Sequence, residues 1–337
     1  MGIGRKFVRV VAALALAFAG APASTQDADR VAVDSIQSPA PSLGNVVSAP
    51  TGLTVFTVSP STGAVTKSSG NGYRVSSGTT RSLVVVSCGG PGYCATTEPT
   101  ITIRSIGSPT GRAGQLTNFV ISPVTATIVS APIGTDPVTF KIAPIGRNET
   151  RSFYVGADFP IYGDDSGKPT GAASANFEVT VSLTPLPFSG SRTGEAIATV
   201  FRPINVALTS NFAFGTISRP FLGSGTVSID SVTGNRTVTG QGVQGMNSPA
   251  PARAAYTVTG EGGQVFSITV PPTFSMTGPG GTITVTTNHT AGGFQSLSGS
   301  LGSPGSYSFR VGGSFPVSST TGLGTYSGSF AVTVQYN

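Results

Sequence analysis

The chain has 337 residues, of which 38% are hydrophobic and only 9% are charged, with 46 glycines, 25 prolines, two cysteines and no tryptophan. This composition is too apolar for a disordered chain, and the length allows two cores of ordinary domain size. The formal net charge is +6, but the Lys and Arg residues are scattered singly, which argues against a nucleic-acid partner.

The N-terminus has the pattern of an export signal. Basic residues in MGIGRKFVR precede the apolar run VVAALALAFAG, and Ala21-Pro22-Ala23 supplies an A-x-A cleavage site. We therefore expect a signal peptide at 1–23 and a mature chain exported through the inner membrane to the periplasm, the cell surface or the medium. Cleavage would lower the formal charge from +6 to +3, because it removes three basic and no acidic residues. The apolar run is too short to span a bilayer, so no membrane span is predicted.

The rest of the chain alternates short Val, Ile, Thr and Phe runs with Gly- and Pro-rich turns, as all-β proteins do. One segment occurs twice. YVGADFPIYGDDSGKPTGAASANFEVTVSL (154–183) corresponds to RVGGSFPVSSTTGLGTYSGSFAVTVQY (310–336), and upstream Leu43-Gly44 corresponds to Phe214-Gly215. This internal duplication predicts two tandem β-sandwich domains of immunoglobulin-like or pilin-like type.

The expected domains are 24–183 and 196–337, joined by a Pro/Gly/Ser-rich linker at 184–195. Alternating Ile204, Val206 and Leu208 predict the first strand of the second domain, and the weaker RVAVDSI (30–36) predicts its equivalent in the first.

The chain closes on a run with period-two alternation. Phe330, Val332, Val334 and Tyr336 point to one side, which predicts a half-buried final strand beginning at about Ser329. Such a strand is either paired within its own domain or left beside an open edge. FRPINVAL could supply a partner and make the unit self-complete, or an extended segment of another protein could be added.

Cys88 and Cys94 stand in CGGPGYC, a Gly/Pro loop of an exported chain, which favours a structural disulfide. The spacing is not C-x-x-C, so a redox role is disfavoured. A metal site would need further ligands, and the single His289 lies in the other half of the chain.

The remaining motifs have ordinary structural explanations. GQGVQG (240–245) fits G-x-G-x-x-G but is followed by MNSPAPAR, whose prolines disfavour the helix of a dinucleotide site, so we expect a turn. The chain has no G-x-S-x-G motif that would supply a nucleophilic serine to His289, so we expect His289 to be exposed and without a catalytic role. Asn148, Asn235 and Asn288 begin N-x-T sequons, which are weak pattern matches and do not by themselves imply glycosylation.

The carboxylates also give no catalytic pattern. Asp164 and Asp165 could offer oxygens to Ca²⁺, but calcium needs six to eight of them, so a solvated turn is favoured. Glu178 falls on the outer face of its strand without a second acid for glycosidase chemistry. We expect no catalytic residues, no cofactor, no metal site and no enzymatic activity.

The second unit resembles a known family in the order of INVALTSNFAFGTIS, GTVSID, AAYTVTGEGGQVFSITVPP, YSFRVGGSFPV and GTYSGSFAVTVQY. It is similar to the bacterial secreted family catalogued as domain of unknown function 4402, which has no established activity. The first unit resembles that family mainly in its last thirty residues. The ending resembles, more loosely, spore coat protein U-like and chaperone–usher pilin domains.

These features predict an exported structural or adhesive cell-surface protein, such as a fimbrial subunit or a two-domain tip adhesin. The resemblance implies other surface or pilus subunits as partners by strand addition, with a periplasmic chaperone and an usher. The alternative is a soluble periplasmic or extracellular module that binds a ligand such as a glycan near Cys88 and Cys94.

Overall fold

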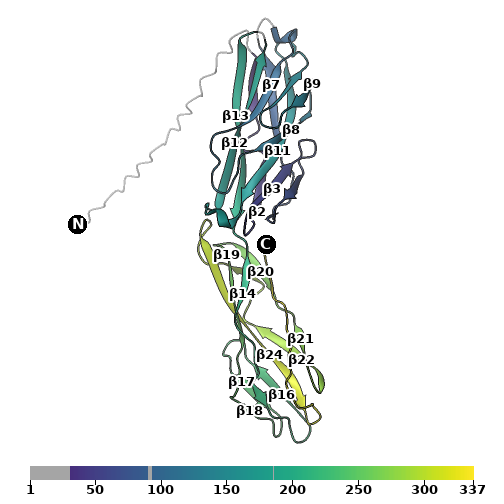
Figure 1. Cartoon of the computed structure of the whole chain (residues 1–337), viewed down its shortest axis with the longest axis vertical. Helices are drawn as coiled ribbons and strands as arrows, with labels where there is room; N and C mark the ends of the chain where they lie inside the picture. The colour runs from purple at the N-terminus through teal and green to yellow at the C-terminus, as the bar shows by residue number, and fades with distance from the viewer. Residues whose placement is uncertain (1–30, 90–92, 185) are drawn as a thin grey trace, which may run out of the picture.

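The computed structural model describes residues 31–89, 93–184 and 186–337, so the expected signal peptide at 1–23 lies outside it. The described chain is all-β, as predicted, with two short 3₁₀ helices at Tyr93–Ala95 and Asp164–Ser166. Two β-sandwich units lie end to end (Figure 1). Within the described residues no helix is both long and apolar enough to cross a bilayer.

The first unit is a sandwich of two sheets around one core. One sheet has the order β1-β6-β11-β3-β4, with β8 also paired to β11, and the other has the order β5-β2-β13-β12-β7-β10-β9. Its strands are β1 (Val31–Ile36), β2 (Ser42–Val47), β3 (Leu53–Val58), β4 (Val65–Ser69), β5 (Tyr73–Arg74), β6 (Ser82–Cys88), β7 (Thr100–Ile106), β8 (Thr117–Pro123), β9 (Ile128–Ile133), β10 (Val138–Ile142), β11 (Thr150–Tyr162), β12 (Gly171–Leu183) and β13 (Phe188–Phe201).

The second unit has one large sheet, β14-β19-β24-β16-β17 with β21-β22 added to β24, and two smaller pieces, β15-β18 and β23-β20-β25. Its strands are β14 (Asn205–Ser210), β15 (Thr216–Ile217), β16 (Ser224–Ile229), β17 (Arg236–Thr239), β18 (Gly245–Met246), β19 (Ala254–Glu261), β20 (Val265–Thr269), β21 (Thr273–Gly278), β22 (Gly281–His289), β23 (Phe294–Ser296), β24 (Pro304–Ser318) and β25 (Thr333–Tyr336).

The duplication seen in the sequence is present in the strand order. The path β1-β6-β11-β3-β4 has its counterpart in β14-β19-β24-β16-β17, β5-β2 in β18-β15, and β10-β7-β12 in β23-β20-β25. The repeated Val-Gly step has the same packing role in both units. A Cβ at Gly156 would collide with the carbonyl oxygen of Val58, and a Cβ at Gly312 with that of Ile229. Glycine is therefore required where β11 and β24 pass close to a neighbouring backbone.

The predicted linker at 184–195 is wrong. Residues 186–187 lie in a turn, and 188–195 are the first half of β13, which pairs with β12 from Phe188 opposite Leu183 to Val200 opposite Gly171. The first unit therefore extends to Phe201, and the chain crosses to the second unit at 202–204. The Gly and Ser residues that suggested a flexible linker are instead accommodated in a long hairpin.

The first strands of both units were predicted correctly, as β1 and β14. The closing strand was predicted too long, because β25 covers Thr333–Tyr336 rather than starting near Ser329. The suggestion that FRPINVAL completes its own unit is also wrong, since β14 pairs with β19 in the opposite sheet and not with β25.

Candidate functional site

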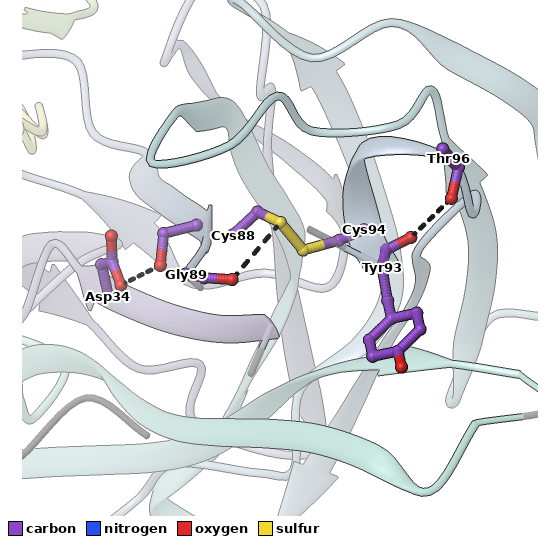
Figure 2. Close-up of a disulfide and its surroundings, with 7 residues drawn as sticks. Asp34, Cys88, Gly89, Tyr93, Cys94 and Thr96 are labelled. Carbon is purple, nitrogen blue, oxygen red and sulfur yellow. Dashed lines mark hydrogen bonds between the residues drawn. A yellow bond between two sulfur atoms is a disulfide. The ribbon is translucent and has the colours of Figure 1, made fainter. Parts of the chain in front are cut away.

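The predicted disulfide is confirmed at the end of the first unit that faces away from the second. Cys88 ends β6 and is bonded to Cys94, with the two Cα atoms 5.9 Å apart (Figure 2). The ring of Tyr93 stacks on Phe188 at the start of β13, with 5.8 Å between centroids, and Tyr93 is half exposed. The disulfide therefore ties Cys94 and the adjacent, half-exposed Tyr93 to the end of β6.

The other motifs have the local structures expected of them. His289 is exposed at the end of β22, with Nδ1 3.0 Å from the carbonyl oxygen of Ala291. GQGVQG (240–245) forms the turn after β17 and ends at Gly245, the first residue of β18. Glu178 pairs with Arg104 at 2.7 Å on the surface of the β7–β12 ladder. Among the described residues, no cluster of three His, Cys, Asp or Glu side chains could hold a metal ion.

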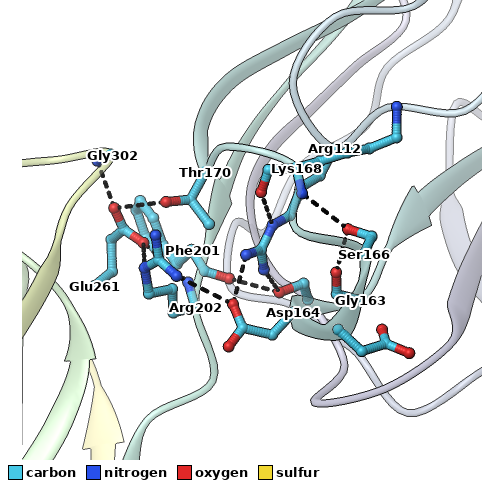
Figure 3. Close-up of polar contacts among 12 residues, drawn as sticks. Arg112, Gly163, Asp164, Ser166, Lys168, Thr170, Phe201, Arg202, Glu261 and Gly302 are labelled. Atoms are coloured by element: carbon cyan, nitrogen blue, oxygen red, sulfur yellow. Dashed lines mark hydrogen bonds and ion pairs between the residues drawn. The ribbon is translucent and has the colours of Figure 1, made fainter.

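Asp164 was expected in a solvated turn, but it belongs to a polar cluster at the joint between the units (Figure 3). Its Oδ1 accepts a hydrogen bond from Nη2 of the fully buried Arg112 at 2.5 Å and lies 3.3 Å from Nη1 of Arg202. Arg112 Nη1 also donates to Ser48 Oγ at 2.6 Å. Asp165, the residue after Asp164, accepts a hydrogen bond from the backbone amide of Gly52 at 3.0 Å.

Glu261 is the second acidic member of this cluster and is completely buried at the end of β19. Its carboxylate accepts hydrogen bonds from Thr170 Oγ1 at 3.0 Å, the Gly302 amide at 2.5 Å and the Arg202 amide at 3.1 Å (Figure 3). The Thr170 bond links the first unit directly to the second. Sequence reasoning missed Glu261, although an acid between glycines at the end of an apolar strand is an unusual placement.

Tyr336, the last residue of β25, also reaches the joint. Its hydroxyl accepts from the Glu261 amide at 2.6 Å and donates to the Arg202 carbonyl at 3.1 Å, and its ring lies 5.7 Å from that of Phe201. Burial raises the pKa of Tyr336 to about 12. The end of β25 is therefore fixed against the first unit.

In the first unit, β13 fills the space between β12 and β2. It runs antiparallel to β12 and parallel to β2. Gly194 lies opposite Phe177, and a Cβ there would collide with the Phe177 ring and come within 2.9 Å of Ile36 Cγ2. The buried side chains that follow in β13 are small: Ala196, Ala198 and Val200.

In the second unit, none of the described residues forms a strand at this position. Among the described strands, β25 pairs with β20 alone and β15 with β18 alone. The edges of β25 and β15 that correspond to the β12 and β2 edges joined by β13 are therefore not connected. The side of β25 that faces away from β20 is an open strand edge. We call the space beside it, between β25 and β15, the open strand position.

Apolar side chains around the open strand position are more exposed than their counterparts in the first unit. Phe177, Val179 and Val181 are fully buried, whereas the corresponding Phe330, Val332 and Val334 are partly exposed. On the facing sheet, Ile36 pairs with Val84 of β6 and Leu208 pairs with Tyr256 of β19, at the same step of the repeat. Ile36 is 9% exposed and Leu208 is 52% exposed.

The second unit matches a known family model. Residues 204–336 match the family model described as Domain of unknown function (DUF4402). The predicted resemblance of this unit to that family is confirmed, and the description names no activity.

No curated protein matches the chain. Seven chains of solved structures match it. One of them, described as "Chaperone-tip adhesin complex is vital for synergistic activation of CFA/I fimbriae biogenesis", is 9% identical, with alignment over 87% of this chain and 95% of that chain and a TM-score of 0.24. A TM-score this low supports no argument about the fold or function of this protein.

Proposed function

We propose that this protein is a non-enzymatic structural or adhesive subunit of an exported surface assembly, whose second unit receives a β-strand from another polypeptide at the open strand position. The observation that carries the proposal is the comparison of the two units. They share their strand order, and within the described residues a strand in the position of β13 is present in the first unit and not in the second.

The exposed side chains supply the energetic argument. Burying apolar surface stabilises a complex by about 25 cal/mol per Å², and Leu208, Phe330, Val332 and Val334 all retain surface that a strand would cover. An incoming strand would also pair with the unpaired amides and carbonyls of β25, which is how extended segments are added to sheet edges. Apolar burial and new backbone hydrogen bonds would therefore both stabilise the subunit when it assembles.

The Cys88–Cys94 disulfide supports an exported location, since such bonds persist in oxidising compartments. Before assembly, an open apolar edge invites aggregation. We therefore propose that a periplasmic chaperone covers the open strand position, that an usher exports the subunit, and that a neighbouring subunit then replaces the chaperone.

The test is to supply the missing strand within the same chain. Asn337 occupies the place of Thr184 in the repeat, so a copy of residues 185–201 added after Asn337 would follow the path that β13 takes in the first unit. We expect the melting transition of the second unit, followed by differential scanning calorimetry, to rise by at least about 5 °C.

The matched control carries the same tail with Ala196→Asp and Ala198→Asp in the tail copy only. These carboxylates would enter the apolar interior, so the tail should give no rise. If the unsubstituted copy of residues 185–201 raised the melting temperature no more than this control, the strand-accepting role would be contradicted.

A glycan-binding module is the second candidate, because Tyr93 is a half-exposed ring supported by Phe188 beside the disulfide. Aromatic rings of this kind have an apolar face and a polar end that suit wet interfaces. The two functions differ in assembly. A structural subunit should be recovered from cells in large sheared assemblies, whereas a soluble module should be recovered as a monomer, and replacing Tyr93 by alanine should then abolish glycan binding.

A further inference from the structure

The geometry points to a specific requirement on the incoming strand. The strand must carry glycine at the residue position that faces Phe330 and Leu208. This inference rests on the proposed strand-accepting function and specifies its ligand. The ligand is an extended polypeptide segment that runs antiparallel to β25 and parallel to β15, as β13 runs relative to β12 and β2.

The first unit shows why glycine is needed. Gly194 passes between the Phe177 ring on its own sheet and Ile36 on the facing sheet. The Cβ of any other residue would collide with the ring and lie 2.9 Å from Ile36 Cγ2, closer than two carbons can approach without a shift of one of them. The position of Gly194 in β13 therefore has no room for a side chain.

Phe330 and Leu208 occupy the same two places in the second unit. Phe330 matches Phe177 in the repeated NFEVTV and SFAVTV segments, and Leu208 matches Ile36 in the register of the facing sheet. An incoming strand would therefore pass between an aromatic ring and a branched aliphatic side chain, as Gly194 does.

The Phe330 ring is held in place by its neighbours. Its centroid lies 4.9 Å from that of Phe274 on β21 and 6.5 Å from that of Tyr256 on β19. Phe177 is supported similarly by Phe119 of β8, at 6.1 Å. Because rings packed on several sides move little, Phe330 would exclude a larger residue rather than yield to it.

The experiment compares two tails on the full chain. One is the copy of residues 185–201, and the other is the same tail with Gly194→Leu. Each is also placed on a chain carrying Phe330→Ala, and each tailed protein is compared with the untailed chain of the same background, so that the loss from Phe330→Ala itself is subtracted.

We expect the leucine tail to lose most of the rise in melting temperature that the glycine tail gives on the wild-type chain. On the Phe330→Ala chain the two tails should differ much less, because removing the ring makes room for leucine. Equal stabilisation by both tails on the wild-type chain would overturn the glycine requirement and leave strand acceptance intact. If the glycine tail itself gave no rise, strand acceptance would fail, and the glycine requirement with it.

Discussion

Replacing Glu261 by glutamine should destabilise the second unit and its joint with the first by about 3 kcal/mol. The carboxylate is fully buried and accepts hydrogen bonds from Thr170, Gly302 and Arg202. Hydrogen bonds to a charged group contribute roughly 1.5–3 kcal/mol each, and glutamine can keep only part of this set because its NH₂ group cannot accept. The Arg202 guanidinium, whose Nε lies 3.6 Å from the Glu261 carboxylate, also has Asp164 as a partner at 3.3 Å. This second partner limits the loss to the lower part of the range for broken buried pairs.

The assay is urea unfolding followed by tyrosine fluorescence and far-UV circular dichroism. Glu178→Gln is the matched control, since that carboxylate also pairs with an arginine, Arg104, but on the surface, where such pairs contribute about 0–1 kcal/mol. A Glu261→Gln loss no greater than the loss in this control would refute the stabilising role of the buried Glu261 carboxylate at the joint.

Three further outcomes follow from the structure. Replacing both Cys88 and Cys94 by serine should lower the free energy of unfolding by about 2 kcal/mol, because the bond closes a short loop, and an unchanged urea midpoint would contradict this. Tyr336→Phe should change the pH dependence of the protein's stability. The folded-state pKa of Tyr336, about 12, lies above the unfolded value of about 10, so its contribution is full below pH 10 and lost as pH rises towards 12. The melting temperature of the variant should therefore fall less over that window than that of the wild type, and parallel curves would count against it. Gly156→Ala and Gly312→Ala should each cost about 1–3 kcal/mol, as both side chains would strike a carbonyl, and a tolerated substitution at either would weaken the equivalence of the two units.

The parts of the fold that the sequence predicts are those set by local patterns. Alternation of apolar residues located β14, the repeated Val-Gly and Phe-Pro steps revealed the two units, and the cysteine spacing in a Gly/Pro loop indicated the disulfide. Each depends on neighbours in the chain or on one repeated motif.

The start of β13 was missed because its glycines have a tertiary cause. Gly194 is selected by Phe177 and Ile36, which lie far away in the sequence, so FSGSRTG resembles a linker while forming a strand. The short extent of β25 has a similar explanation. The residues from Phe330 to Val332 have the strand pattern, but a ladder needs a partner backbone, and β20 reaches only as far as Thr269 before two prolines.

The polar joint was also beyond local reasoning. Asp164 begins a short 3₁₀ helix of the first unit and Glu261 ends a strand of the second, and Arg202 between the units brings them into one cluster. Only the folded chain places these charges together. The sequence signal was limited to an acid in an otherwise apolar and glycine-rich segment.

The most direct measurement of the open strand position is amide hydrogen exchange at Val334, compared with Val181. The Asn337 amide donates to the Val265 carbonyl, so by alternation the amide of Gln335 faces β20 and that of Val334 faces the open side. Val181, its counterpart, pairs with Gly190 of β13 on that side.

We therefore predict that Val334 exchanges rapidly in the natural chain while Val181 is strongly protected, and that the tail copied from residues 185–201 slows exchange at Val334. Protection of Val334 equal to that of Val181 in the chain without a tail would contradict the account.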